Sequence, residues 1–303
     1  MVDISKISTE KRNQNTKNID IASTKSILQM INHEDKTVAY AVEKAIDQIT
    51  VVVDLVTDAF RNSGRLIYIG AGTSGRLGVL DASECPPTFG VPNDMVIGLI
   101  AGGDKALRTP IEGVEDSKEH ARKDLKKIHL TAKDIVIGIA ASGRTPYVIG
   151  GIEYAKSVGA KTGCITTAEN SELARVADHP IEAITGAEPL TGSTRMKSGT
   201  AQKLILNMIT TASMVKIGKV YENLMIDVQM SNNKLVSRAT NIVMEVTGCT
   251  EEVAEAYLAK YNSVKYAIFG IMSNIEDKSK IKEMLEEHNG NIRESLKSCK
   301  QIF

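Results

Sequence analysis

The sequence has no tryptophan, few aromatic residues of any kind and no net charge. Lys plus Arg and Asp plus Glu both number 37, so no overall field favours nucleic acid or an anionic membrane as a partner. The N-terminus has no apolar core of a signal peptide, and no run of residues is apolar enough to span a membrane. We therefore expect a cytoplasmic protein that binds neither nucleic acid nor a membrane, and any anion site must be local.

Cysteine and histidine are too scattered for a metal site. The four cysteines, Cys85, Cys164, Cys249 and Cys299, include no C-x-x-C pair, and the five histidines show no ligand spacing. Widely spaced cysteines are typical of free thiols in a reducing compartment. The sequence therefore predicts no metal and no disulfide framework.

The chain does have enough apolar residues for a core, and it has a distinctive glycine loop. Of the 303 residues, 42% are hydrophobic, which is enough for one large domain plus a small one. Leu66–Ile69 has the pattern of a buried strand, and it runs directly into Gly70–Gly75, where glycines let the backbone turn tightly. Thr73 and Ser74 place hydroxyl and amide donors at the start of the next helix, which favours an anion there.

The same loop has the spacing G-x-G-x-x-G, which by itself is a weak indication of a dinucleotide site. Such a site requires an acidic residue at the end of a second strand about 20 residues further on. Here that interval holds Asp81 and Glu84 in an expected helix, followed by Pro86 and Pro87 that should close it. NAD is therefore not favoured, and a purely structural glycine turn remains the alternative to an anion site.

Strands and helices alternate along the middle of the chain. We expect helices at 22–31 and 36–62, and a charged, helix-prone segment at 110–129. Strands are expected at 66–69, 95–101, 134–140, 162–166 and 179–184. Such alternation implies right-handed crossovers, so the predicted class is α/β with a doubly wound, five-stranded parallel sheet.

A second hydroxyl-bearing loop follows the third strand. Ser142, Gly143 and Thr145 head the next expected helix, as Thr73 and Ser74 head the earlier one. Because the carboxyl ends of parallel strands meet at one edge of a sheet, both loops could face one pocket at the topological switch point. We expect these residues to hold an anionic group by their hydroxyls and amides.

The stretch 185–208 is the most distinctive of the chain. Its sequence is TGAEPLTGSTRMKSGTAQKLILNM, and it gathers hydroxyls, cations and a carboxylate before an apolar helix expected at 200–217. These polar side chains are Glu188, Thr191, Ser193, Thr194, Arg195, Lys197 and Ser198. Polar groups delivered to a helix N-terminus can bind a ligand, although they can also simply cap and turn the chain.

Together these stretches resemble a known family. The two strand-end loops resemble those of the sugar isomerase (SIS) fold, which hold the phosphate of a phosphosugar, over residues 53–219. The run 185–208 resembles the signature shared by bacterial N-acetylmuramic acid 6-phosphate etherases and the glucokinase regulatory protein. Asp81–Gly90 and Glu112–Asp116 resemble the etherase versions of those segments.

The resemblance implies an activity and a set of site residues. It implies removal of the D-lactyl group from N-acetylmuramic acid 6-phosphate in cell-wall recycling, with no metal or organic cofactor, in a homodimer whose subunits share active sites. Glu84 would act as the acid and Glu115 as the base, with their exact division of labour left open. The implied substrate-binding residues are Thr73, Ser74, Gly75, Arg76, Ser83, Ser142, Gly143, Thr145, Glu188, Ser193, Thr194, Arg195 and Lys197.

Two other functions remain open at this stage. A phosphosugar isomerase would share the fold and the proton transfer at C2 but would have no leaving group. A phosphosugar-sensing regulator would bind the sugar without turnover, and a DNA-reading one should carry a basic helix-turn-helix before the SIS domain. Residues 1–62 instead show a polar arm, which a partner could order, and a long helix.

The expected domain organisation has three parts. Residues 1–52 form an arm and helices, 53–219 the SIS domain, and 220–303 a small helical bundle. In that bundle we expect helices at 232–246, 251–258, 263–271 and 278–288. In the etherase family such a bundle resembles a ubiquitin-associated-like module.

Overall fold

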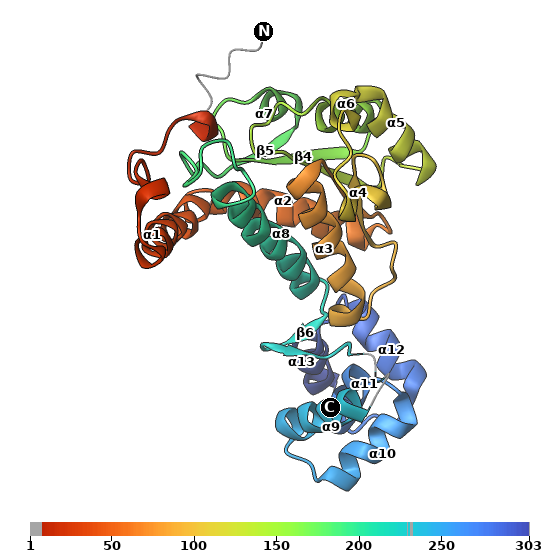
Figure 1. The fold of residues 1–303 in the computed structure, drawn as a ribbon. Coiled ribbons are helices and arrows are strands. Elements are labelled where there is room, and N and C mark those ends of the chain that lie inside the picture. Colours follow the sequence, from red (N-terminus) through yellow and green to blue (C-terminus); the bar gives the residue numbers. More distant parts are fainter. Residues whose placement is uncertain (1–7, 229, 231–232, 303) are drawn as a thin grey trace. The chain divides into compact units, whose positions relative to one another are not determined.

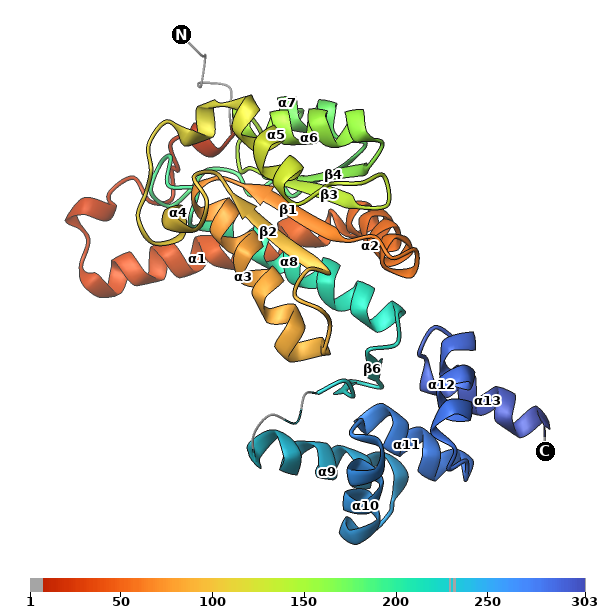
Figure 2. The ribbon, with the colours of Figure 1, turned by 90° about the vertical axis from the view of Figure 1, so that its right-hand side faces the viewer.

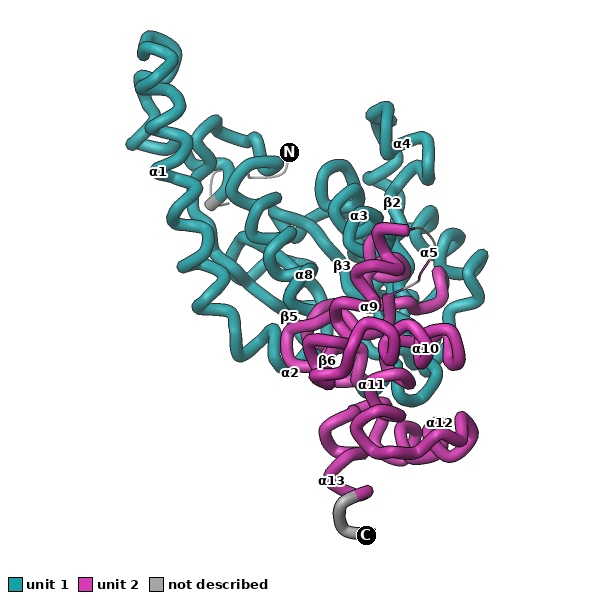
Figure 3. Tube along the Cα trace, turned by 90° about the horizontal axis from the view of Figure 1, so that it is seen from below, with its two compact units in different colours: residues 1–83, 94–210 teal, residues 84–93, 211–303 magenta. Residues whose placement is uncertain are grey.

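The computed structural model describes residues 8–228, 230 and 233–302. The chain forms two compact units, one made of residues 1–83 and 94–210, the other of residues 84–93 and 211–303 (Figure 3). The boundary falls inside two helices, α3 (Gly72–Phe89) and α8 (Lys197–Lys216), so each of them contributes to both units.

A five-stranded parallel sheet forms the centre of the first unit. Its strands are β1 (Leu66–Gly70), β2 (Val96–Ile100), β3 (Ile135–Ile139), β4 (Lys161–Thr166) and β5 (His179–Glu182). They lie in the order β2-β1-β3-β4-β5, and every neighbouring pair is parallel. The predicted doubly wound α/β sheet is confirmed, and each strand lies within two residues of its expected bounds.

Helices cover both faces of the sheet (Figures 1 and 2). On one face lie α5 (Lys118–Lys127), α6 (Pro146–Val158) and α7 (Glu172–Val176), and on the other lie α2 (Ile46–Arg61), α3 and α8. All five residues of β1 are buried, with Ile67 and Ile69 in the same apolar cluster as Val148 and Ile152 of α6. A strand buried on both sides needs an unbroken apolar run, which is why β1 was recognisable in the sequence.

The strand order reverses between β1 and β3, and this reversal locates the switch point of the sheet. The last residue of β1, Gly70, is paired with Ile139, the last residue of β3. The glycine loop after β1 and the serine loop after β3 therefore leave the sheet side by side. In open α/β sheets this is the position at which ligands bind.

The N-terminal helices differ from the expectation. A single helix, α1 (Thr24–Glu43), runs through the predicted break between residues 31 and 36, and the break to α2 falls at Lys44–Ala45 instead. The polar residues 32–35 suggested a loop, but Glu34 is buried and paired with Lys197. This tertiary contact keeps the segment helical, whereas no glycine or proline marks the true break.

The polar arm is ordered by its own chain. It contains two short 3-10 helices, η1 (Ser8–Glu10) and η2 (Ile19–Ile21). Asn13 Nδ2 donates to the carbonyl of Ala187 at 3.2 Å, and Thr16 Oγ1 donates to the carbonyl of Pro189 at 2.7 Å. The arm thus lies on the 185–195 segment, so the described part of it needs no other partner to become ordered.

Two predicted helix bounds are also wrong. Helix α3 passes through Pro86 and Pro87 and ends at Phe89, although each proline lacks an N–H and leaves one carbonyl of the preceding turn without its helical donor. The helix-prone segment 110–129 is divided into η3 (Val114–Asp116) and α5, after a short α4 (Asp104–Arg108). Gly113 stands before η3 with φ of 74°, a left-handed conformation that interrupts a helix.

The second unit is a small helical bundle. Its helices are α9 (Asn233–Thr247), α10 (Glu251–Tyr261), α11 (Val264–Ser273), α12 (Lys278–Glu287) and α13 (Ile292–Ile302), after a hairpin of β6 (Val220–Tyr221) and β7 (Leu224–Met225). The first four helices were predicted, although the expected start at residue 232 lies outside the described residues. The hairpin and α13 were missed; two-residue strands are too short to show alternation, whereas α13 does carry Ile292 and Cys299 on a buried face.

Candidate active site

The loop after β1 folds so tightly that only glycine fits at two of its positions. A Cβ atom on Gly70 would lie 2.6 Å from the nitrogen of Gly75, and one on Gly75 would lie 2.8 Å from the oxygen of Gly70. Strand and helix backbones thus touch directly where α3 begins. The first amides of α3 have no carbonyl partner within the helix, so this turn is suited to bind an anion.

The two hydroxyls of this loop lie in different surroundings. Thr73 is partly exposed, whereas Ser74 is buried and its Oγ donates to Gln202 Oε1 of α8 at 2.9 Å. Gln202 is 1% exposed, and its Nε2 has no hydrogen-bond partner among the described residues. Ser74 therefore offers a ligand its backbone amide, while its hydroxyl is engaged by α8.

The loop after β3 depends on a glycine as well. Gly143 has φ of 63°, and a Cβ atom there would collide with Ser171. Its carbonyl accepts a hydrogen bond from the amide of Leu173 at 2.9 Å. Ser142 is half-buried, and the side chain of Thr145 makes no capping bond at the start of α6, so both hydroxyls remain suited to bind a ligand.

The start of α8 lies between these two loops. Ser198 Oγ is 2.9 Å from Thr167 Oγ1, and the amide of Thr167 donates to the carbonyl of Ala141 at 3.0 Å. On the other side, Gly199 approaches Thr73, whose Cγ2 would lie 3.5 Å from a Cβ atom on that glycine. The 185–208 stretch therefore supports both strand-end loops at the switch point.

Glu188 supports this arrangement from a buried position. Its carboxylate is fully buried and accepts hydrogen bonds from the amides of Lys197 and Ser198, at 2.7 and 2.9 Å, and from Ser198 Oγ at 2.7 Å. A carboxylate at this position caps α8 and complements its dipole. Glu188 thus caps α8, and the substrate contact expected of it remains a prediction.

Lys197 is likewise buried. It is 4% exposed, and its Nζ lies 2.7 Å from Glu34 Oε2 and 3.2 Å from the carbonyl of Ala187. Burial alone would raise the pKa of Glu34, but hydrogen bonds from Lys197, Asn15 and Asn13 and the charge of Lys197 hold it below the ordinary value. Lys197 thus forms a buried ion pair with α1, and its expected substrate role remains a prediction.

The other polar residues of this stretch lie nearer the surface. Ser193 and Thr194 are half-buried in a turn, where the carbonyl of Thr194 accepts a hydrogen bond from the amide of Gly199, and Arg195 is exposed. Ser83, expected to bind substrate, is exposed on α3 and donates to the carbonyl of Leu80 at 2.7 Å. The roles of these four residues remain predictions.

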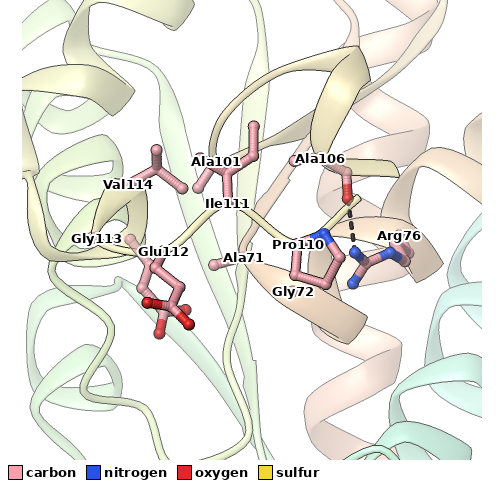
Figure 4. A pocket seen from close by; sticks show the side chains of 11 residues that line it. Ala71, Gly72, Arg76, Ala101, Ala106, Pro110, Ile111, Glu112, Gly113 and Val114 are labelled. Carbon is pink, nitrogen blue, oxygen red and sulfur yellow. Dashed lines mark hydrogen bonds between the residues drawn. The ribbon is translucent and has the colours of Figure 1, made fainter. Parts of the chain in front are cut away.

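A cavity of about 230 Å³ opens at the ends of β1 and β2 (Figure 4). Its lining comes from the glycine loop, from α3, from the end of β2 and from the segment after it: Ala71, Gly72, Arg76, Ala101, Ala106, Pro110, Ile111, Glu112, Gly113, Val114 and Glu115. Two carboxylates, Glu112 and Glu115, therefore line a cavity beside the expected anion loop. Both are exposed, so water and solutes reach them freely.

Glu84, the other expected catalytic carboxylate, lies near the end of α3. It belongs to the second compact unit, whereas Glu115 belongs to the first. Its side chain is exposed. The catalytic pairing of the two glutamates stays a prediction.

A buried aspartate on α3 was not recognised from the sequence. Asp81 is 6% exposed, and its Oδ1 accepts hydrogen bonds from Asn207 Nδ2 at 2.8 Å and Thr210 Oγ1 at 3.2 Å. Burial raises the pKa of Asp81, although these hydrogen bonds and one from Tyr68 oppose that shift. Asp81 joins α3 to α8, and its position in the etherase-like stretch 81–90 was the one available signal.

Two wider features of the described chain bear on function. Among residues 8–228, 230 and 233–302, no three His, Cys, Asp or Glu side chains gather to hold a metal ion. No helix in those ranges has both the length and the apolar character that crossing a membrane requires. The expectations of no metal and no organic cofactor remain predictions.

Family models match most of the chain. The model of the glucokinase regulatory protein N-terminal SIS domain matches residues 48–156, and the SIS domain model matches residues 109–212. The model of the C-terminal lid domain of glucokinase regulatory protein matches residues 222–284. The matched regions thus include both strand-end loops, the cavity and most of the helical bundle.

Individual relatives are similar over nearly the whole chain. The N-acetylmuramic acid 6-phosphate etherase of Actinobacillus succinogenes is 56% identical over 289 residues, which are 95% of this chain and 95% of that protein. The etherase of Clostridium botulinum is 55% identical over 297 residues, 98% of each chain. Among solved structures, the phosphoheptose isomerase of Neisseria gonorrhoeae is 16% identical, with a TM-score of 0.49 over 63% of this chain and 98% of that chain.

Proposed function

Since the chain belongs to the N-acetylmuramic acid 6-phosphate etherase family, we propose that it releases D-lactate from N-acetylmuramic acid 6-phosphate and leaves N-acetylglucosamine 6-phosphate. The observation that carries this proposal is the 56% identity with an etherase over 95% of both chains. Two glycine-containing loops suited to bind an anion lie at the switch point, with a carboxylate-lined cavity beside them. Both features support the proposal.

The chemistry is an elimination followed by hydration. An alkyl ether resists direct hydrolysis because its alkoxide is a poor leaving group. Once the sugar ring opens, the C1 aldehyde acidifies the C2 proton, and a base can remove it. The released electron pair forms a C2–C3 double bond, the C3–O bond breaks, and an acid protonates the departing lactyl oxygen. Water then adds at C3, and a proton returns to C2.

The residues of this chain divide between binding and proton transfer. In this proposal Glu115, on the cavity wall, takes the C2 proton, and Glu84 protonates the lactyl oxygen. The phosphate is held by the amides at the start of α3 and by Ser142, Gly143 and Thr145 at the start of α6. Fixed donors at two helix N-termini suit a dianionic group because both helix dipoles favour negative charge.

Removing one phosphate-binding hydroxyl should mainly weaken binding. Ser142→Ala is expected to raise KM for the phosphorylated sugar roughly ten- to hundredfold with kcat little changed, since a hydrogen bond to a charged group contributes about 1.5–3 kcal/mol. Ser157→Ala is the matched control, because Ser157 is exposed on α6 and donates only to the carbonyl of Tyr154. An unchanged KM in Ser142→Ala would mean that the phosphate binds elsewhere.

We also propose a cytoplasmic homodimer in which neighbouring subunits complete each other's sites. The family resemblance carries this part of the proposal, and its test changes two exposed apolar side chains of α1, Leu28 (62% exposed) and Tyr40 (67% exposed). Sedimentation equilibrium measures the mass in solution. A dimer that dissociates in Leu28→Glu/Tyr40→Glu is expected, and a monomeric parent protein would contradict this part of the proposal.

The activity is tested with the purified protein and N-acetylmuramic acid 6-phosphate. Release of D-lactate in step with N-acetylglucosamine 6-phosphate is expected. Conversion of a phosphosugar between its aldose and ketose forms without lactate would indicate an isomerase. Tight binding of the phosphosugar with no turnover would indicate a sensing regulator.

A further inference from the structure

The guanidinium of Arg76 is bound to the protein's own backbone. Its Nε donates to the carbonyl of Leu107 at 2.9 Å. Its Nη2 donates to the carbonyl of Ala106 at 2.6 Å, the bond drawn in Figure 4. Both acceptors lie in α4, the short helix after β2, toward its C-terminal end. Helix C-terminal carbonyls carry partial negative charge and attract a cation, so the side chain is held where it lies.

These two bonds join α3 to a compact segment that we call the acidic loop, residues 102–116. Gly102, with φ of 89°, lies at its centre: a Cβ atom there would lie 3.2 Å from both Ala106 Cβ and Ile111 Cδ1, and 3.4 Å from Val114 Cγ2. The apolar side chains of Ala106, Ile111 and Val114 therefore pack around Gly102, the first residue of the loop. Glu115 directly follows Val114, which also packs against the core cluster that includes Val148 of α6, so the position of Glu115 depends on these contacts.

Backbone hydrogen bonds at the ends of α4 and in η3 lie within the acidic loop. Within it, the amide of Ala106 donates to Gly103, that of Thr109 to Lys105 and that of Asp116 to Gly113. A helix of five residues such as α4 is unstable without outside contacts. The fork of Arg76 supplies such a contact from the first turns of α3, immediately after the glycine loop.

We propose that Arg76 is a positioning residue, which anchors the acidic loop to α3 and so fixes Glu115 against the cavity. This replaces the substrate contact that the sequence led us to expect of Arg76, because the Nε–Nη2 edge of its guanidinium is committed to two carbonyls. The catalytic consequence rests on the proposed function, whereas the anchoring itself does not. Lysine can replace arginine here only in part, since an ammonium is a single point donor and not a planar fork.

Hydrogen exchange tests the anchoring without any assay of activity. In Arg76→Gln, the amides of Ala106 and Thr109 should exchange on the order of tenfold faster than in the parent protein, because two charge-assisted bonds are lost. Arg76→Lys should be intermediate. Arg108→Gln is the matched control, since it removes an exposed cation from the same α4 and should leave these rates unchanged. Unchanged rates in Arg76→Gln would overturn the proposal.

Kinetics distinguish a positioning role from a contact with the ligand. Arg76→Gln should lower kcat at least tenfold, with KM and inhibition by inorganic phosphate changed less than threefold. A large rise in KM and weaker inhibition by phosphate, with kcat retained, would mean that Arg76 binds the phosphate and would overturn the proposal. If the parent protein releases no lactate, the proposed function fails, while the exchange experiment still decides whether Arg76 anchors the loop.

Discussion

Replacing Glu115 with glutamine is expected to lower kcat for lactate release by a factor of about 10² to 10⁴, the usual contribution of a positioned general base. Glutamine keeps the size and the hydrogen-bonding edge of the side chain but cannot accept the C2 proton. Glu115 lines the cavity beside the glycine loop, so KM should change little. The measurement is a steady-state assay of D-lactate across substrate concentrations.

Glu112→Gln is the matched control for that variant. Glu112 is also exposed and lines the same cavity, so it shares the general electrostatic surroundings of Glu115 without the proposed proton transfer. The fold decrease in kcat of Glu112→Gln should be less than a tenth of the decrease seen in Glu115→Gln. If Glu112→Gln were the inactive variant and Glu115→Gln the active one, the base would have to be reassigned.

Solvent deuterium separates the two glutamate roles. With a product analogue that lacks the lactyl group, Glu115→Gln should fail to exchange the C2 proton with D₂O, whereas Glu84→Gln should still exchange it. With N-acetylmuramic acid 6-phosphate itself, Glu84→Gln should release lactate slowly. The opposite pattern would exchange the acid and base roles. Loss of both steps in Glu115→Gln together with normal rates in Glu84→Gln would mean that a single carboxylate moves both protons.

Lys197→Met is expected to destabilise the protein by about 3–5 kcal/mol, because it leaves Glu34 buried without its cation. Denaturant unfolding at neutral pH measures the loss. Lys203→Met is the control, since Lys203 is exposed on the same α8 and should change stability by no more than about 0.5 kcal/mol. Glu34→Leu combined with Lys197→Met removes both charges and should recover part of the loss.

Acid provides a second test of the same ion pair. The pKa of Glu34 is held below its ordinary value of 4.5, so its ionised form contributes stability above that pH. This contribution is lost as the pH falls through the lowered pKa of the folded state. The stability difference between the parent protein and Lys197→Met should therefore shrink below about pH 4.5. A difference that stays constant into acid would argue that packing, and not charge, sets the cost.

The sheet and its loops could be predicted because their signals are local. A strand buried on both faces needs a continuous apolar run, as in Leu66–Gly70, and a backbone turn as tight as Gly70–Gly75 needs glycine. The parallel, doubly wound arrangement of the strands then followed from alternation and handedness. For these elements, nearby residues alone carry the information.

The roles of single polar residues could not be predicted in this way. Lys197 and Glu34 are 163 positions apart in the chain, and nothing near Lys197 indicates that it will be buried. Glu188 is a residue type that often binds ligands. It lies nine positions before Lys197 at the start of α8, and from there it caps the helix. Residue type indicated that these side chains make polar contacts, while the partners that each one meets in the fold decided which contacts they are.

Heavy-oxygen water tests the central claim most directly. The purified protein is incubated with N-acetylmuramic acid 6-phosphate in that solvent, and the molecular masses of both products are measured by mass spectrometry. Elimination followed by hydration places the heavy oxygen in the C3 hydroxyl of N-acetylglucosamine 6-phosphate and leaves the lactate unlabelled. Heavy oxygen in the lactate would mean that the bond on the lactyl side is cleaved, and the roles assigned to Glu84 and Glu115 would both be contradicted.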